Sequence, residues 1–259
     1  MKVIILAGGR PSSIDEADGK VPKPMAEIGN RPILWHIMKQ FGHYGFNDFI
    51  ICAGYKSTVI KEYFLNFYIN QSDITVDLQN NDITIHKKQN ENWRVSVFDT
   101  GVDTPVTQRI KFVKDYIGDD DFIVTFGDCI SNINIAEMVE LHKKNSKLAT
   151  VAITRPTGRN EILSLDPDGV FDFREKTIEY YNNAWVNACV MIFQKEIFHY
   201  LKDGDEILEE STLKELSSND LIQTYKHNGF WLPVETMRNK TYLESLWLQD
   251  HPPWKIWES

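Results

Sequence analysis

The sequence predicts a doubly wound α/β fold with a mostly parallel, Rossmann-like sheet, and three observations lead to this prediction. Short apolar, β-branched runs typical of buried parallel strands occur at 2–6, 48–53 and 121–126. Stretches with apolar residues at helical spacing separate these runs, as in βαβ units with right-handed crossovers. Glycine follows each run closely, at the sheet edge where ligands of such folds bind.

The first strand leads into a glycine turn and a stiff lysine segment. Gly8 and Gly9 let the backbone turn tightly and approach a ligand. The segment 22–25 reads Pro-Lys-Pro-Met, and its prolines restrict the chain so that Lys23 projects from a rigid base. Pro32 then opens an amphipathic helix. A strand, a glycine turn, a held lysine and a helix together suggest a nucleotide phosphate site.

The remaining elements follow in order. Two segments, 74–78 and 83–86, alternate with period two around a turn and predict a hairpin. The alternation continues through Trp93 to Val97, so the region 74–99 is predicted to be an antiparallel excursion that serves as an edge flap or oligomer contact. We expect further helices at 56–67, around 110–117, from Asn134, at 194–202, 206–218 and 237–249, strands at 149–153, 185–193 and 221–226, and a hairpin tip at 166–169.

Composition limits the class of protein. The formal charge of −9 argues against a nucleic-acid surface, and no stretch approaches the ~18 apolar residues of a membrane span. Because the first strand begins at once, no signal peptide is expected. Three widely spaced cysteines without a CxxC pair are expected to be reduced and mostly buried in strands. These features indicate a cytoplasmic protein with one domain, 1–259, that ends in a helical, Trp-rich tail from about 237.

Asp128 is the strongest single candidate for chemistry. It follows a buried strand and Gly127, where it could hold Mg²⁺ or cap the following loop. Lys23 could contact phosphate as a point charge or be a solvated loop lysine. Glu235 could be a second metal carboxylate or an acid at a helix N-terminus.

Three further polar residues are candidates, each with an ordinary alternative. Arg109 and Lys176 could equally lie on the surface, and Asn187 could be a satisfied buried amide. The sequence contains no HExxH, GxSxG or Walker A motif, so zinc-protease, hydrolase and P-loop chemistry are not indicated.

Taken together, the motifs resemble those of the sugar-phosphate nucleotidyltransferases, most closely the glucose-1-phosphate cytidylyltransferases. The resemblance covers nearly the whole chain and implies a nucleotidyltransferase (GT-A-like) fold. The matching stretches are 2–9, 23–38, 48–56, 60–64, 99–101, 127–128, 229–231 and 253–255. The family's reaction is attack by a substrate phosphate on the α-phosphorus of a nucleoside triphosphate with release of pyrophosphate.

The resemblance implies a role for each candidate residue, with CTP as the nucleotide and Mg²⁺ as the cofactor. Lys23 would neutralise the α-phosphate and the attacking phosphate, Asp128 and Glu235 would bind Mg²⁺, and Arg109 would contact phosphates of both substrates. Lys176 and Asn187 would hold the phosphorylated acceptor. The residues expected to bind the nucleotide are Leu6, Ala7, Gly8, Gly9, Arg10, Lys23, Arg109 and Gly127. Related enzymes are oligomeric, so a homo-oligomer is expected.

The chain departs from the family pattern at four places. The family's Gly-Thr-Arg-Leu loop is replaced by Arg-Pro-Ser-Ser-Ile at 10–14, and its Asn-Gly-Gly by Asn-Ala-Cys at 187–189. Glu-Lys-Pro has become Glu-Lys-Thr at 175–177, and the family's metal Asp is Glu235.

These departures leave the acceptor and the activity open. Glucose 1-phosphate, used to make a surface-polysaccharide precursor, is the default acceptor. A phosphorylated amino acid such as phosphoglutamine, or a polyol phosphate, is the alternative. A non-catalytic nucleotide-binding scaffold, suggested by the lost loop, is the second alternative.

Overall fold

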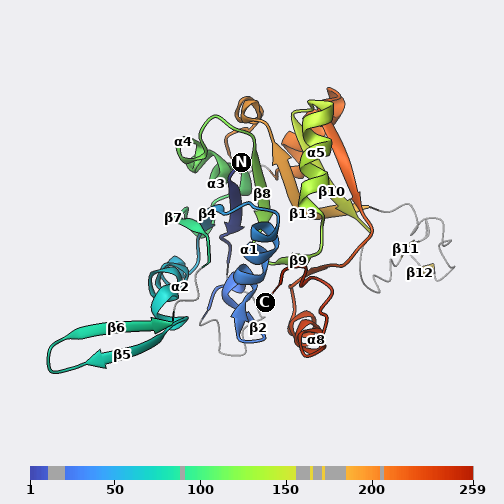
Figure 1. Ribbon diagram of the computed structural model, residues 1–259. Coiled ribbons are helices and arrows are strands. Elements are labelled where there is room, and N and C mark those ends of the chain that lie inside the picture. The colour runs from blue at the N-terminus through green and yellow to red at the C-terminus, as the bar shows by residue number, and fades with distance from the viewer. Residues whose placement is uncertain are drawn as a thin grey trace.

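A seven-stranded, mostly parallel sheet forms the centre of the molecule, as the sequence predicts (Figure 1). The computed structural model describes residues 1–10, 21–87, 91–155, 164–165, 171–172, 185–204 and 207–258. The strand order is β14-β10-β13-β8-β1-β4-β7. In that order the strands span Ile222–His227, Ala149–Thr154, Val186–Phe193, Phe122–Phe126, Val3–Ala7, Asp48–Ala53 and Arg94–Asp99. Among them, β13 alone runs antiparallel to its neighbours.

Helices cover both faces of this sheet, so its central strands are buried on both sides. Alternate residues of β1 face opposite cores: Val3 and Ile5 belong to one cluster, Ile4 and Leu6 to the other. The first cluster includes side chains of α1 (Ile33–His43), α2 (Ser57–Asn70), α5 (Ile135–Asn145) and α8 (Met237–Trp247). The second includes those of α3 (Val106–Phe112), α4 (Lys114–Ile117), η2 (Lys195–His199), η3 (Glu209–Leu213) and α7 (Lys214–Ser218). Burial on both faces explains why β1 is a continuous apolar run.

Most element predictions are confirmed, with shifts of a few residues at the ends. Asn134 caps α5 by accepting a hydrogen bond from the Glu137 backbone N–H. The helical stretch around 110–117 is divided into α3 and α4 at Val113. The predicted hairpin near 166–169 has its flanking strands, β11 (Ser164–Leu165) and β12 (Phe171–Asp172), paired antiparallel, and its tip lies outside the described residues.

One part of the predicted antiparallel excursion is wrong. The hairpin is formed by β5 (Asp73–Asp77) and β6 (Asp82–Lys87), but β7 is not part of it. Instead, β7 pairs in parallel with β4 at the edge of the main sheet. An edge strand covered on one face shows the same period-two alternation as a hairpin strand, so the pattern alone did not separate the two.

Smaller two-stranded pairs and an aromatic tail complete the fold. β2 (Glu27–Ile28) pairs with β3 (Arg31–Pro32), and β9 (Cys129–Ser131) pairs with β15 (Trp231–Pro233). The side chain of Trp254, 1% exposed, packs against α1 beside His36. The three cysteines are free, as predicted, with Cys189 only partly buried. In the part of the chain that is described, no helix is long and apolar enough to cross a membrane.

Candidate active site

The first wall of the site is the turn that follows β1. Gly8 carries no side chain, and a Cβ added there would lie 1.9 Å from Nη1 of Arg109. Only glycine therefore allows the chain to pass over this guanidinium. Gly9 has a φ of +144°, a conformation that other residues rarely adopt, so its backbone favours glycine, whereas Gly8 is constrained by the Arg109 side chain.

The lysine segment is rigid, as its prolines predict. Lys23 begins the one-turn 3₁₀ helix η1 (Lys23–Met25), in which Pro24 and Met25 are buried. Backbone hydrogen bonds close the turn, from the N–H of Met25 to the carbonyl of Pro22 (2.8 Å) and from the N–H of Ala26 to that of Lys23 (3.0 Å). The lysine side chain thus starts from a fixed base.

Asp128 lies next to Lys23 in the lining of the pocket. The ammonium of Lys23 donates a 3.0 Å hydrogen bond to Oδ2 of Asp128, and the two side chains are 26% and 28% exposed. Such partial burial leaves both groups accessible to a ligand. The N–H of Gly127 bonds the carbonyl of Leu6 (3.0 Å), which holds the end of β8 against the end of β1. Asp128 is therefore positioned by the central strands of the sheet.

The pairing of β15 with β9 brings the backbone just before Glu235 next to Asp128. Pro233 lies opposite Cys129, and the N–H of Val234 donates to the carbonyl of Asp128 at 2.7 Å. Glu235 follows directly and is exposed. Although 107 positions separate them in the printed sequence, the two acids predicted to bind metal are brought to neighbouring backbone positions.

A pocket of about 180 Å³ lies between these segments. Its lining contains most of the predicted nucleotide-binding residues and three that the sequence analysis did not assign. The lining residues are Leu6, Ala7, Gly8, Gly9, Arg10, Pro22, Lys23, Pro24, Tyr55, Gly127 and Asp128. Tyr55 follows β4 and Gly54, so the rule that places ligands at the carboxyl ends of strands could have identified it.

Arg109 lies under the glycine turn and is not among the pocket-lining residues. It is 3% exposed and donates to the hydroxyl of Thr100 (2.5 Å) and the carbonyls of Gly101 (2.8 Å) and Val102 (3.0 Å). Burial lowers the pKa of this guanidinium. In this arrangement Arg109 holds loop 100–102 against Gly8, and its predicted contact with phosphate stays a prediction.

Of the remaining predicted residues, Arg10 lies at the pocket, and Asn187 is not among the residues that line it. Arg10 lines the pocket and pairs through Nε with Oδ1 of Asp103 at 2.8 Å. Asn187 lies on β13, where its Oδ1 accepts a hydrogen bond from the N–H of Cys189 at 2.9 Å. Cys189 has a φ of +66°, a conformation that favours glycine, which fits the Gly found at this place in the family pattern. Lys176 lies outside the described residues.

The donor set suits a magnesium ion shared with a substrate. Among the described residues, no three His, Cys, Asp or Glu side chains gather into a metal-binding group. Mg²⁺, however, is usually held by one or two carboxylates together with substrate phosphates and water, rather than by a complete protein cage. Asp128 provides one carboxylate of this kind beside the predicted phosphate lysine, and a metal-binding role for Glu235 stays a prediction.

Comparison with known proteins identifies the family. The nucleotidyl transferase family model matches residues 2–239. The glucose-1-phosphate cytidylyltransferase of Salmonella typhi is 38% identical over 259 residues, covering 100% of both chains. The mannose-1-phosphate guanyltransferase of Yarrowia lipolytica is 24% identical and covers 90% of this chain and 60% of its own.

Solved structures agree on the fold. Apo UDP-glucose pyrophosphorylase superposes with a TM-score of 0.66 at 16% identity, covering 95% of this chain and 98% of its own. HddC from Yersinia pseudotuberculosis superposes with a TM-score of 0.65 at 17% identity, covering 95% and 99%. With a family model over most of its length and a full-length relative at 38% identity, the chain belongs to the nucleotidyl transferase family.

Proposed function

We propose that this nucleotidyltransferase transfers CMP from CTP to a phosphorylated small molecule and releases pyrophosphate, with glucose 1-phosphate as the default acceptor. The observation that carries the proposal is the Lys23–Asp128 pair at 3.0 Å in the pocket beside the glycine turn. Full-length similarity to the Salmonella typhi glucose-1-phosphate cytidylyltransferase supports the choice of nucleotide and acceptor. The product would be a cytoplasmic, nucleotide-activated precursor for surface polysaccharide.

Phosphoryl-type transfer needs positioning and charge neutralisation more than covalent help. Lys23, fixed by its proline-bounded turn, would hold the α-phosphate and the attacking phosphate together and offset their repulsion. Asp128 orients the ammonium before substrate binds, because the two groups are hydrogen-bonded. Mg²⁺, held by Asp128 and Glu235, would neutralise negative charge on the triphosphate. Gly8 and Gly9 would let the nucleotide lie close to the backbone.

A non-sugar phosphate acceptor, such as a phosphorylated amino acid or a polyol phosphate, is a second candidate. Two departures from the family pattern favour it, and both concern the acceptor and metal side of the site. Cys189 stands where the family has glycine and adds a side chain next to Asn187. Glu235 carries its carboxylate one methylene further from the backbone than aspartate, which changes where metal and acceptor phosphate meet.

A substrate panel tests the proposal. The protein is incubated with Mg²⁺, each of the four ribonucleoside triphosphates, and either glucose 1-phosphate, phosphoglutamine or a polyol phosphate, and pyrophosphate release is followed. We expect release with CTP and one acceptor. The acceptor that gives it decides between the two candidates, and the Asp128→Asn variant serves as the inactive control.

The same panel separates enzyme from scaffold. If no acceptor yields pyrophosphate while calorimetry still detects CTP binding, the enzyme reading is wrong and the non-catalytic scaffold is supported. If neither turnover nor CTP binding occurs, the cytidine specificity is wrong as well.

A further inference from the structure

Two cations gather on one indole ring at the edge of the sheet. Cζ of the Arg155 guanidinium lies 3.9 Å from the ring centroid of Trp185, and the ammonium of Lys226 lies 5.4 Å from the same centroid. Neither cation nor the tryptophan is among the residues that line the Lys23–Asp128 pocket. Two positive charges held beside one ring repel each other, so the arrangement favours an anion that both can contact.

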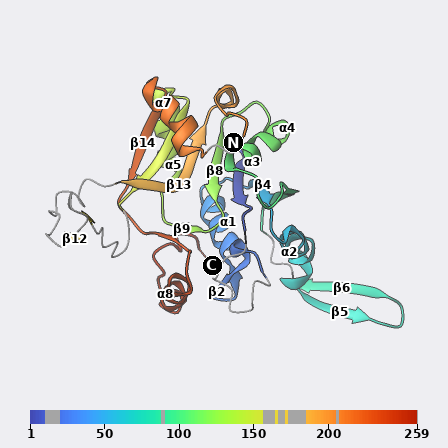
Figure 2. The same ribbon diagram turned by 180° about the vertical axis from the view of Figure 1, so that it is seen from behind.

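The strand order places these three side chains on the same edge of the sheet as the pocket. β14, β10 and β13 form the end of the sheet away from the β5–β6 hairpin, as both views show (Figures 1 and 2). Because β13 is antiparallel to both β10 and β8, these two strands end at the same edge. Arg155 directly follows β10, Trp185 directly precedes β13, and Asp128 lies just past β8. They therefore share the edge at which ligands of such sheets bind.

The register also relates the cations to Asn187, which is predicted to hold the acceptor. Ile153 lies opposite Lys226 on one neighbouring strand and opposite Asn187 on the other. Side chains paired in this way point to the same face, and so do those two positions apart on one strand. Arg155 and Trp185 continue this face past the strand ends, in agreement with their contacts.

The spacing suits a small acceptor. Neighbouring strands lie about 4.8 Å apart, so the ends of β8 and β10, separated by β13, are about 10 Å apart. A phosphorylated hexose or amino acid, together with a long arginine or lysine side chain, spans this distance. An acceptor with its phosphate at Lys23 would therefore bring its other end within reach of Arg155 and Lys226.

The two cations suit a carboxylate. A guanidinium binds a carboxylate through two parallel hydrogen bonds, and an ammonium adds a point charge. The side chain of Lys226 is exposed and forms no ion pair within the described residues, whereas Arg155 and Trp185 are half-buried. Glucose 1-phosphate, which has no charged group besides its phosphate, would leave these cations without an anionic partner of its own.

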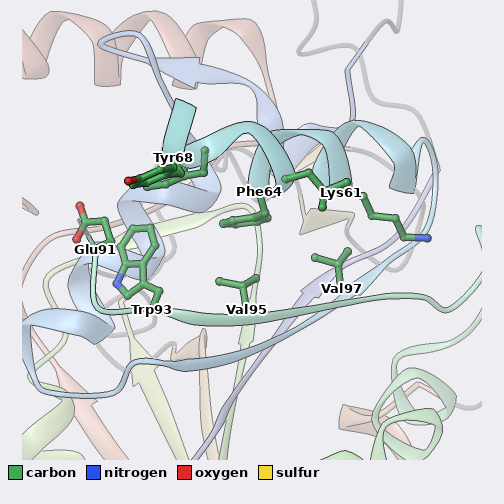
Figure 3. Close-up of a pocket in the computed structure, with 9 residues that line it drawn as sticks. Lys61, Phe64, Tyr68, Glu91, Trp93, Val95 and Val97 are labelled. Carbon is green, nitrogen blue, oxygen red and sulfur yellow. The ribbon is translucent and has the colours of Figure 1, made fainter. Parts of the chain in front are cut away.

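A cavity of about 580 Å³ between α2 and β7 does not suit an anion in the same way. The side chains of Phe64, Trp93 and Val95 face one another there, and Lys61 and Glu91 lie at its two ends (Figure 3). The lysine in its described lining is thus offset by an acid, and β7 is at the opposite end of the sheet from β14.

We propose that Arg155 and Lys226, oriented by Trp185, bind a second negatively charged group of the acceptor, so that phosphorylated acceptors with a carboxylate are preferred over their neutral counterparts. The inference rests on the proposed function, because it ranks acceptors of the same transfer. An acceptor phosphate oxygen bonds to the α-phosphorus of CTP, and the bond from that phosphorus to the bridging oxygen breaks with release of pyrophosphate. The carboxylate takes no part in these bond changes and lowers KM.

Two matched acceptor pairs test the proposal, because the members of each pair differ in one carboxylate. Glucuronic acid 1-phosphate is compared with glucose 1-phosphate, and phosphoglutamine with its α-amide, in CMP transfer from CTP with Mg²⁺. We expect kcat/KM to be at least ~10-fold higher for the carboxylate member of at least one pair, mainly through KM. Equal use of both members, or preference for the neutral member, in both pairs would overturn the proposal while leaving the transfer itself intact.

Variants test which residues set the preference. Arg155→Gln, Lys226→Gln and Trp185→Leu should each lower the ratio of the two kcat/KM values, and Arg155→Lys should lower it less than Arg155→Gln. This ratio is measured on one protein sample, so partial unfolding does not change it. Lys143→Gln removes the same charge from an exposed position on α5 and should keep the wild-type ratio. A wild-type ratio in both Arg155→Gln and Lys226→Gln would contradict the assignment.

Binding separates failure of this inference from failure of the proposed function. If no acceptor yields pyrophosphate, the proposed transfer is wrong, and calorimetric titration of the same four acceptors in the presence of Mg²⁺ still measures the preference. Tighter binding of a carboxylate member, lost in Arg155→Gln, would support the anion site. Equal affinities within both pairs, or no binding of any of the four acceptors, would overturn it.

Discussion

The ammonium of Lys23 lies 3.0 Å from Oδ2 of Asp128, although 105 positions separate the two residues. The pairing arises because β1 and β8 are adjacent and parallel, so their carboxyl ends meet at one edge of the sheet. The Lys23 segment folds back over that edge, with Pro24 against Gly127. A paired cation and carboxylate are thus assembled in the pocket beside the glycine turn.

Replacing Lys23 by alanine should reduce kcat/KM for pyrophosphate release by at least ~10²-fold, because a preorganised charge at the reacting phosphate is lost. CTP affinity, measured by calorimetry, should change much less than turnover. The exposed Lys114→Ala variant is the control and should behave as wild type. Unchanged turnover in Lys23→Ala would remove this lysine from the mechanism, whereas lost turnover with retained binding would exclude the scaffold alternative.

Asp128→Asn keeps the size of the side chain and removes its charge. We expect turnover to fall by at least ~10²-fold, and the Mg²⁺ concentration for half-maximal activity of the residual enzyme to rise, because carboxylates are the preferred ligands of this ion. The melting temperature should move by only a few degrees, since the pair is partly exposed and contributes little to stability. A variant with wild-type Mg²⁺ dependence would show that Asp128 does not hold the metal.

Ligands of parallel sheets bind at the carboxyl ends of the strands, and this rule explains which parts of the site were predictable from the sequence. Gly8, Lys23 and Asp128 follow recognisable strand and turn signals, and they do line one pocket. Tyr55 obeys the same rule but carries no charge to draw attention to it. The position of Arg109 could not be predicted, because its contacts with loop 100–102 depend on the tertiary approach of α3 to β1.

The fold, like the site, was predictable from the sequence in some parts and not in others. Continuous apolar runs identified the buried strands β1, β4 and β8, since burial on both faces demands them. The parallel pairing of β7 was missed because strand direction is set by the crossover through α2 and the following β5–β6 hairpin, which local alternation does not record.

Gly8→Ala should destabilise the protein by about 2 kcal/mol and reduce turnover, because the new methyl group overlaps Arg109. The guanidinium cannot easily move, since it is buried and bonded to Thr100 and to two loop carbonyls. Urea unfolding of Gly8→Ala, Arg109→Ala and the double variant measures this overlap. In the Arg109→Ala background the added methyl should lower the free energy of unfolding much less than in the wild type. If the losses of the two single variants simply add up in the double variant, the steric explanation is refuted.

Stability should fall on acidification because His36 is buried in its neutral form. The ring is 1% exposed; its Nε2–H donates to the carbonyl of Ile28 (2.9 Å), and its Nδ1 accepts from Nε1–H of Trp254 (3.3 Å). A second proton on the His36 ring, at Nδ1, would point at the indole N–H of Trp254. Burial accordingly lowers the pKa of His36 from 6.5 to about 4.

The sign of the effect follows from proton linkage. The unfolded chain binds a proton at His36 below about pH 6.5, and the folded chain does so only near pH 4. The contribution of neutral His36 is complete above pH 6.5 and is lost as the pH falls towards 4, by about 2 kcal/mol at pH 5. His142 and His227, whose pKa values burial also lowers, act in the same direction. Urea unfolding at pH 7.5 and pH 5 should therefore show a larger loss for the wild type than for His36→Gln, and equal losses would mean that His36 protonates as readily in the fold as in the unfolded chain.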